Sequence, residues 1–234
     1  MTYYWNKQYF EGLKAIGEAY AIRQDYELFG AYCLQKEQGL KKLANGTSEK
    51  FVSMVEGMMP AKQLKIAIQL CQLNYDNPEV HSLINHPLAE FIHAILKCAS
   101  QETPDSIEVY RWYARYCFSE NDEDKNKILE RALNIDPSDQ LVLEQSVTKA
   151  FHYLAYMVHH LNENILIGNL DEARGQLGIL KSQLPRLIDG EEKAKFQSRF
   201  AYYETLFRLW EEYTKGTKES LFIDWAYEQE QFEW

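Results

Sequence analysis

Apolar residues recur with the period of an α-helix along nearly the whole chain, and this rhythm limits the fold more than any other feature. Val147, Phe151, Leu154, Val158 and Leu161 follow one another at steps of three and four, which places them on one helix face. The alternation typical of a half-buried strand does not persist for a useful length. Connections between the periodic segments are short, so we expect an all-α fold of successive antiparallel helices.

The helical period and its interruptions predict where the helices lie. The predicted helices span residues 3–22, 25–44, 48–58, 60–74, 78–85, 87–101, 105–118, 123–134, 138–163, 169–183, 190–214 and 217–231. Asn45-Gly46-Thr47 is expected to form the turn between two of them. Side chains that cap a following helix are expected at Asn77, Thr103 and Asp136, each directly before a proline.

No linker rich in Gly and Ser, or in Pro, separates parts of the chain. We therefore expect a single all-helical domain over residues 1–234. The alternative is a helical bundle over residues 1–102, joined to a repeat-like acidic half over residues 103–234.

One stretch resembles the second helix of a tetratricopeptide repeat, a helical hairpin that is stacked in arrays. In residues 154–187, Gly168 stands at the turn, Ala173 at a small position, Leu177 at a large apolar position and Pro185 at the end of the helix. This resemblance implies antiparallel helical hairpins that form a tetratricopeptide-like array or an irregular bundle. It also implies a protein-binding scaffold, by analogy of fold.

A second, more divergent copy covers residues 106–139. Its matching positions are Tyr116, Leu129, Ala132 and Pro137. Both copies have large residues where the family has small ones, and these are Tyr113, Lys125 and Leu161. The departures imply that the two hairpins pack differently from the repeats that they resemble.

The charge is unevenly distributed along the chain. The whole chain has a net charge of -10, and residues 118–234 contribute 22 Asp+Glu against 13 Lys+Arg, a net of -9. An acidic half repels phosphate backbones, which argues against nucleic acid as a partner. It attracts a basic protein and speeds its association, although solubility alone is an equally simple explanation.

The cysteines and the first residues indicate a cytoplasmic location. Cys33, Cys71, Cys98 and Cys117 form no CxxC pair, and Cys33 and Cys98 are expected to be buried on their helices as reduced thiols. The N-terminus lacks the layout of a signal peptide, and no run reaches the ~18 apolar residues that span a bilayer. We therefore expect no membrane association.

No catalytic, cofactor or metal motif stands out, so we expect no enzyme activity, no cofactor and no bound metal. Glu90 and His93 have the ExxH spacing of di-iron bundles, but the comparable element, His160 with Glu163, is reversed. The chain has no GxSxG, P-loop or GxGxxG. Gly175 and Gly178 suggest a close contact between helices instead.

Carboxylates and aromatic rings occur together at three places, and these are the candidate contact surfaces. The candidate partner-binding residues are Asp122, Glu123, Asp124, Trp210, Glu211, Glu212, Tyr213, Asp224, Tyr227, Glu228 and Trp234. Rings beside carboxylates can grip a cationic protein surface through packing and ion pairs. The alternatives are core packing for the rings and a solvated helix start for the acidic turn. Phe222 and Trp225 are expected to dock inward.

These features predict a non-enzymatic protein that neutralises a basic partner through an acidic, aromatic surface. Bacterial toxin-immunity proteins, which block a basic toxin domain, are the class that fits best by analogy of charge and size. The first alternative is a tetratricopeptide-like adaptor that holds a peptide in a concave groove. The second is a metal-dependent enzyme in a helical bundle. The sequence leaves the oligomeric state open, since the aromatic helix face suits a core or a dimer seam.

Overall fold

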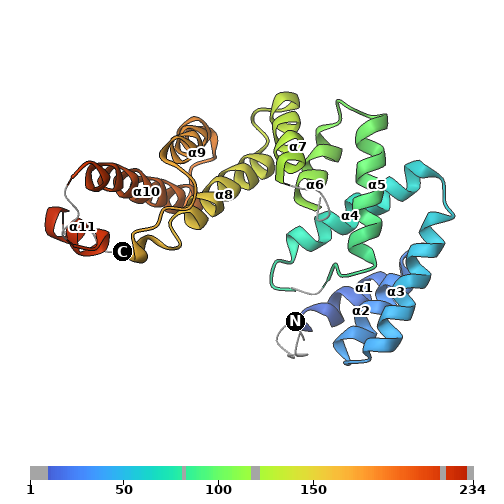
Figure 1. The fold of residues 1–234 in the computed structure, drawn as a ribbon. Helices are drawn as coiled ribbons and strands as arrows, with labels where there is room; N and C mark the ends of the chain where they lie inside the picture. Colours follow the sequence, from blue (N-terminus) through green and yellow to red (C-terminus); the bar gives the residue numbers. More distant parts are fainter. Residues whose placement is uncertain (1–9, 81–82, 117–121, 217–219, 231–234) are drawn as a thin grey trace. The chain divides into compact units, whose positions relative to one another are not determined.

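The fold is all-α. The computed structural model describes residues 10–80, 83–116, 122–216 and 220–230, and the side chains of Asp122 and Glu230 lie outside this description. Within these segments every regular element is a helix (Figure 1).

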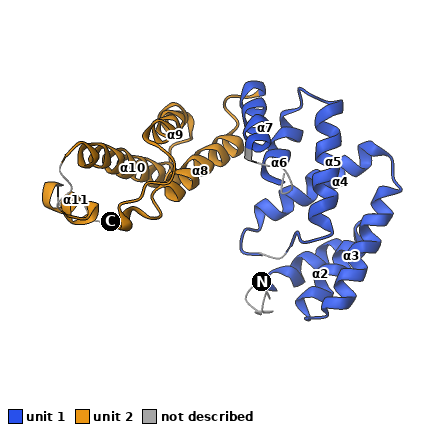
Figure 2. Ribbon diagram, in the orientation of Figure 1, with its two compact units in different colours: residues 1–135 blue, residues 136–234 orange. Residues whose placement is uncertain are grey.

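Contacts gather the chain into two compact units, residues 1–135 and residues 136–234 (Figure 2). The helices of unit 1 are α1 (Leu13–Ala21), α2 (Glu27–Glu37), α3 (Lys41–Glu56), α4 (Pro60–Asp76), α5 (Leu88–Glu102), α6 (Ile107–Tyr116) and α7 (Asp122–Ile135). The alternative boundary between residues 102 and 103 falls inside this unit, where α5 packs against α6. The expectation of one domain stays a prediction.

Unit 2 contains four α-helices and two short 3₁₀ turns in its described residues. They are α8 (Gln140–Met157), η2 (Leu161–Glu163), α9 (Leu170–Gln183), η3 (Leu184–Arg186), α10 (Glu191–Lys215) and α11 (Phe222–Glu230). The predicted bounds of α9 and α10 are confirmed to within a residue. Pro185 lies in η3, directly after α9, so this helix ends where the proline predicts.

The first two helices of unit 1 approach so closely that glycine is needed on both. A Cβ atom on Gly30 would lie 2.6 Å from the Cα of Ala21 and 2.8 Å from the carbonyl oxygen of Gly17. A Cβ on Gly17 would lie 2.7 Å from the side chain of Leu34. Gly17, in the middle of α1, therefore lies beside Leu34, late in α2, whereas Ala21, at the end of α1, lies beside Gly30, early in α2. The two helices therefore run in opposite directions.

Aromatic rings join the helices of unit 1 in its core. Phe29 of α2 and Phe51 of α3 are fully buried, with ring centroids 5.8 Å apart. Trp112 of α6 is 1% exposed, and its ring lies 6.1 Å from that of Tyr75 on α4. Pairs with this spacing contribute about 0.5–1.5 kcal/mol each beyond the area they bury.

The core of unit 2 forms where α8 meets α10. Phe151 of α8 is fully buried, and its ring stacks at 5.7 Å on Phe196 and lies 6.0 Å from Tyr203. The guanidinium of Arg199 sits 4.7 Å from the Phe151 centroid. Val147, Phe151 and Leu154 are buried, which confirms the apolar face predicted for α8. Along α10, the rings of Tyr203, Phe207 and Trp210 are buried, whereas those of Phe196 and Phe200 are half-buried.

The predicted turn at Asn45-Gly46-Thr47 is wrong, because α3 runs straight through it. The chain turns earlier, at Gly39, whose φ of 78° closes the end of α2. There the N–H of Leu40 donates to the carbonyl oxygen of Gln35 at 2.9 Å, a common way to end a helix. As a result Leu40 and Leu43, which fall within the helix predicted over residues 25–44, lie after this turn and are 45% and 55% exposed.

The predicted helix over residues 78–85 is also wrong. The described residues in this stretch form turns and irregular backbone. Val80 and Leu83 are nevertheless buried, so this segment contributes apolar side chains to the core without a helical period.

The three residues before prolines do not cap helices as predicted. Each opens a turn in which the residue three positions later donates its N–H back to the carbonyl, and the pairs are Val80 to Asn77, Ser106 to Thr103 and Asp139 to Asp136. The cap follows the turn: Asp139 accepts a hydrogen bond from Val142 N at 3.1 Å and starts α8. Proline is favoured both at the second position of such a turn and at the first position of a helix, and at these three sites it occupies the turn.

Gly175 and Gly178 do not make the predicted close helix contact. A Cβ atom on either residue would meet nothing within 4 Å, so both face open space on α9.

The two kinds of glycine predict opposite effects of alanine. Gly30→Ala should lower the free energy of unfolding by about 1–3 kcal/mol, because the new methyl collides with backbone. Gly175→Ala should raise it by up to about 1 kcal/mol, because alanine favours the helix and has room. Urea unfolding followed by circular dichroism measures both. A destabilised Gly175→Ala variant would contradict the open face on α9.

Candidate protein-binding surface

Four aromatic rings join the end of α10 to α11. Phe222 is 1% exposed, and its ring lies 5.0 Å from Trp210 and 5.5 Å from Tyr213, in edge-to-face geometry. Trp225 adds contacts to Tyr213 at 5.6 Å and to Phe222 at 6.4 Å. We call these four residues the aromatic cluster. Phe222 and Trp225 therefore dock inward, as the sequence predicts.

Two of the candidate contact residues lie within this cluster. Trp210 is 5% exposed and Tyr213 is 2% exposed, since α11 covers both. In this arrangement the rings position α11 and are not available to a partner at the surface. The structure thus follows the core-packing alternative for these two side chains.

Two hydrogen bonds fix the start of α11. The N–H of Phe222 donates to Oδ1 of Asn164 at 2.7 Å, which satisfies an otherwise open amide of the first helical turn. Asn164 has a φ of 59°, in the left-handed region that asparagine tolerates. The hydroxyl of Tyr213 donates to the carbonyl oxygen of Ser220 at 2.7 Å. Nothing in the sequence around Asn164 indicates this role, because its partner lies 58 residues further along the chain.

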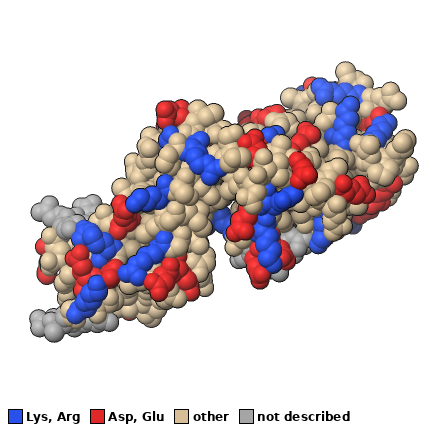
Figure 3. Space-filling model, turned by 90° about the horizontal axis from the view of Figure 1, so that it is seen from above, with Lys and Arg blue, Asp and Glu red and all other residues tan. Residues whose placement is uncertain are grey.

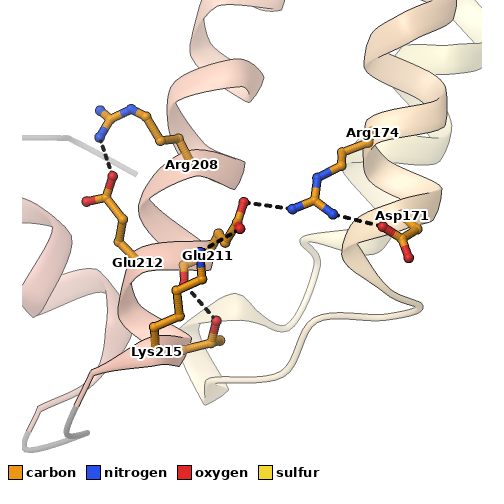
Figure 4. A network of polar contacts seen from close by, with 7 residues as sticks. Asp171, Arg174, Arg208, Glu211, Glu212 and Lys215 are labelled. Carbon is orange, nitrogen blue, oxygen red and sulfur yellow. Dashed lines mark hydrogen bonds and ion pairs between the residues drawn. The ribbon is translucent and has the colours of Figure 1, made fainter.

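Glu211 and Glu212 are engaged in ion pairs within unit 2. Glu211 binds Lys215 at 2.7 Å and Arg174 at 2.8 Å, and Arg174 also binds Asp171 at 2.8 Å (Figure 4). Hydrogen bonds from Lys215 and Arg174 lower the pKa of Glu211. The network connects α9 to α10, and exposed pairs of this kind contribute only about 0–1 kcal/mol each.

The second carboxylate of this pair has a partner on its own helix. Arg208 binds Glu212 at 3.0 Å, one helical turn earlier (Figure 4). Because both groups are exposed, a partner protein could replace the pair at little cost.

The side of α11 that faces away from the aromatic cluster carries the remaining described candidates. Asp224 and Glu228 are exposed, and Tyr227 is 55% exposed. Leu221, just before the helix, is 50% exposed. These four residues are the α11 outer face. Asp224 and Glu228 lie one turn apart, and neither has an ion pair or hydrogen bond with any residue in the described part of the chain.

The acidic segment at the start of α7 belongs to unit 1 and is partly neutralised. Lys127 binds Glu123 at 2.7 Å and Asp124 at 3.5 Å. The hydrogen bond from Lys127 lowers the pKa of Glu123. The side chain of Asp122 and all of Trp234 lie outside the described residues.

Acidic and basic groups are interspersed on the face shown in Figure 3. Residues 136–234 nevertheless contain 17 Asp+Glu and 10 Lys+Arg, a net charge of -7. Most described cations of this unit already bind a carboxylate or a carbonyl. The excess negative charge therefore lies on acids that pair with no described cation, such as Asp224 and Glu228 of the α11 outer face.

The histidines considered as metal ligands are dispersed. Glu90 binds His86 at 3.2 Å, whereas His93 packs at 5.8 Å from the ring of Tyr113. His160 contacts Glu163 at 3.0 Å. Across the described ranges, no group of three or more His, Cys, Asp or Glu side chains lies close enough to hold a metal ion.

The cysteines follow the sequence prediction only in part. Cys33 and Cys71 are fully buried, and burial raises the pKa of the Cys33 thiol to about 12. Cys98 is exposed, which contradicts its predicted burial, because it lies on the side of α5 that faces away from the core. Cys117 lies outside the described residues.

Among the cations in the described part of the chain, a buried lysine has the most strongly shifted pKa. Lys36 of α2 is 5% exposed, and its Nζ donates to the hydroxyl of Tyr32 at 2.8 Å. With the Asn85 amide oxygen facing it, a second acceptor lies 2.7 Å away. The Tyr32 hydroxyl donates to the carbonyl oxygen of Leu83 at 3.3 Å, so this network ties α2 to residues 83–85. Burial lowers the pKa of Lys36 to about 8. The sequence shows Lys36 only as a charged interruption of an apolar face.

Comparison with known proteins adds no family to this description. No protein-family model matches the chain, and neither does any curated protein or solved structure. None of the helices in the described segments has both the length and the apolar character that a bilayer span requires. The function must therefore be inferred from the geometry of the described residues.

The Lys36 amine predicts a stability that rises with pH. Its pKa is about 8 in the folded state against 10.5 without the fold, so the unfolded chain binds more protons above pH 8. Lys36 alone should add about 1 kcal/mol to the free energy of unfolding between pH 8 and pH 9. The buried thiols of Cys33 and Cys71 oppose this as the pH approaches the ordinary thiol pKa of 9.0, because burial raises the pKa of both in the folded state. Urea titrations of the wild type and of Lys36→Met at each pH measure the Lys36 contribution as the difference between the two slopes, and equal slopes would rule out Lys36 as a source.

Proposed function

We propose that this protein is a non-enzymatic protein-binding protein that neutralises a basic partner, and that the α11 outer face is its contact surface. The observation that supports this is the pair Asp224 and Glu228, two exposed carboxylates with no partner among the described residues, beside the exposed ring of Tyr227. Its class would be an inhibitor of the toxin-immunity type, which binds a basic toxin domain.

The chemistry of this surface suits lysine and arginine side chains. Unpaired carboxylates attract a cationic protein over distances near the Debye length and raise the rate of encounter. Tyr227 can then stack on a guanidinium or bury its ring, which supplies packing that charge alone does not give. While α11 is docked, the aromatic cluster on its opposite side fixes its position, which reduces the entropy lost on binding.

The remaining candidate residues take different roles in this proposal. Trp210 and Tyr213 support the contact surface from beneath. Glu211 and Glu212 extend the acidic surface if their cations exchange to the partner. Glu123 and Asp124 form a separate candidate contact on unit 1, where Lys127 reduces their charge.

A tetratricopeptide-like adaptor is the second candidate, and the α8–α9 segment favours it. Gly168 has a φ of 82° at the turn, Asn169 caps α9 by accepting from Glu172 N at 3.0 Å, and Ala173 is fully buried. In the second segment, Ala132 of α7 is likewise fully buried. These are the small and turn positions of the repeat pattern, and a peptide held by such hairpins would bind with little dependence on salt.

Charge reversal on α11 tests the first proposal. The protein serves as bait in an extract of its source cells, and a captured basic protein is purified and its Kd measured directly. Asp224→Lys with Glu228→Lys should weaken binding by about 10-fold or more, because two attractions become repulsions. Binding should also weaken steeply as salt rises from about 0.05 M to about 0.5 M.

A matched variant separates this surface from net charge. Glu108→Lys with Glu130→Lys makes the same change in charge on exposed carboxylates of unit 1 that pair with no described residue. Near-normal binding of this control would localise the contact to α11. Equal losses in both variants, or none in either, would refute the α11 outer face, and salt-insensitive binding would favour the adaptor.

A further inference from the structure

We propose that α11 opens and closes as a unit of its own, separately from α8 to α10, and that Asn164 sets the balance between the two states. This inference concerns the described part of unit 2 and holds whichever partner the protein binds. It depends on where the interactions between α11 and the other described residues of this unit lie.

The helix is too short to persist alone. α11 has nine residues, whereas isolated helices shorter than about 12–15 residues are marginal in water. Its main neighbours are the end of α10 and the short turn η2. When these contacts are lost, α11 should therefore lose its helical structure as well, so that docking and helix formation occur together.

Apolar docking is concentrated in one side chain. Phe222 packs against both Trp210 and Tyr213 and is 1% exposed, and Ala226, one turn later, is equally buried. Trp225 is half-buried beside them. The core of α8 and α10 around Phe151 does not include these residues, so it can stay closed while the aromatic cluster opens.

The polar anchor comes from outside the helix. Asn164 is held by its own N–H, which donates to the carbonyl oxygen of Leu161 at 3.0 Å, and it offers Oδ1 to the N–H of Phe222 at 2.7 Å. Tyr213 adds its hydrogen bond to Ser220. On opening, water replaces both partners, which makes a net difference of only about 0.5–1.5 kcal/mol for each bond.

Opening changes what the surface displays. The closed state presents the α11 outer face on a rigid helix and hides Trp210 and Tyr213. The open state exposes both rings at the end of α10 and leaves Asp224 and Glu228 on an unfolded segment. The same residues therefore make two different surfaces, and position 164 governs their populations.

Amide hydrogen exchange, resolved by mass spectrometry or NMR, tests this on the full chain. In the wild-type protein, amides of α11 should exchange faster than those of α10 between Tyr203 and Trp210, because they open without the core. Asn164→Gly keeps the left-handed backbone but removes the acceptor, and should speed α11 exchange by about 2- to 10-fold. Exchange of residues 203–210 should stay within about twofold of the wild type.

Two further variants complete the test. Asn164→Asp keeps both the acceptor and the backbone tolerance, so its α11 exchange should stay near the wild-type rate. Tyr213→Phe keeps the ring but loses the bond to Ser220, and should speed α11 exchange as Asn164→Gly does. Equal exchange rates for α11 and α10 in the wild type would overturn the proposal. So would an equal acceleration of both helices in Asn164→Gly.

Discussion

The aromatic face of α10 is the interaction on which the arrangement of unit 2 depends. Its first half meets Phe151 of α8 through Phe196 and Tyr203, and its last turns meet Phe222 of α11 through Trp210 and Tyr213. One helix of 25 residues thus organises helices on both sides of it. Because most helical stability in proteins comes from packing of an apolar face, packing on α10 decides where α8 and α11 lie.

Burial of these rings also decides which acidic groups are available. The turns of α10 that direct Trp210 and Tyr213 inward direct Glu211 and Glu212 outward, toward Arg174 and Arg208. On α11 the same division leaves Asp224 and Glu228 exposed, with no cation from the described part of the chain bound to either. The exposed carboxylates and the buried rings therefore lie on opposite sides of the same helices. A change that displaces Phe222 alters the aromatic packing and the acidic surface together.

Local signals predicted the parts of the fold that local interactions determine. Asn169 caps α9 through a neighbour three residues away, so the start of that helix was predictable. The end of α2 was missed because Gly39 and Gly46 are equally good turn residues by composition, and only packing of α3 decides between them. Helical periodicity predicted that α10 has an aromatic face.

The candidate site was predictable by residue type but not by exposure. Periodicity cannot show that α11 folds back over Trp210 and Tyr213, since that contact joins separate segments. Asn164 and Lys36 were missed for a related reason: their partners, Phe222 and Asn85, are remote in sequence. Polar side chains in such positions resemble ordinary surface residues until the fold brings their partners close.

The left-handed backbone at Asn164 has a consequence for how this loop can change. The position needs a residue that accepts a φ of 59° and also has an oxygen at the end of a short side chain. Glycine meets the first requirement, serine and threonine meet the second, and asparagine and aspartate meet both. A half-buried loop position would ordinarily tolerate many side chains, but only asparagine and aspartate meet both requirements at this one. The substitutions that position 164 tolerates are therefore restricted by a helix that begins 58 residues further along the chain.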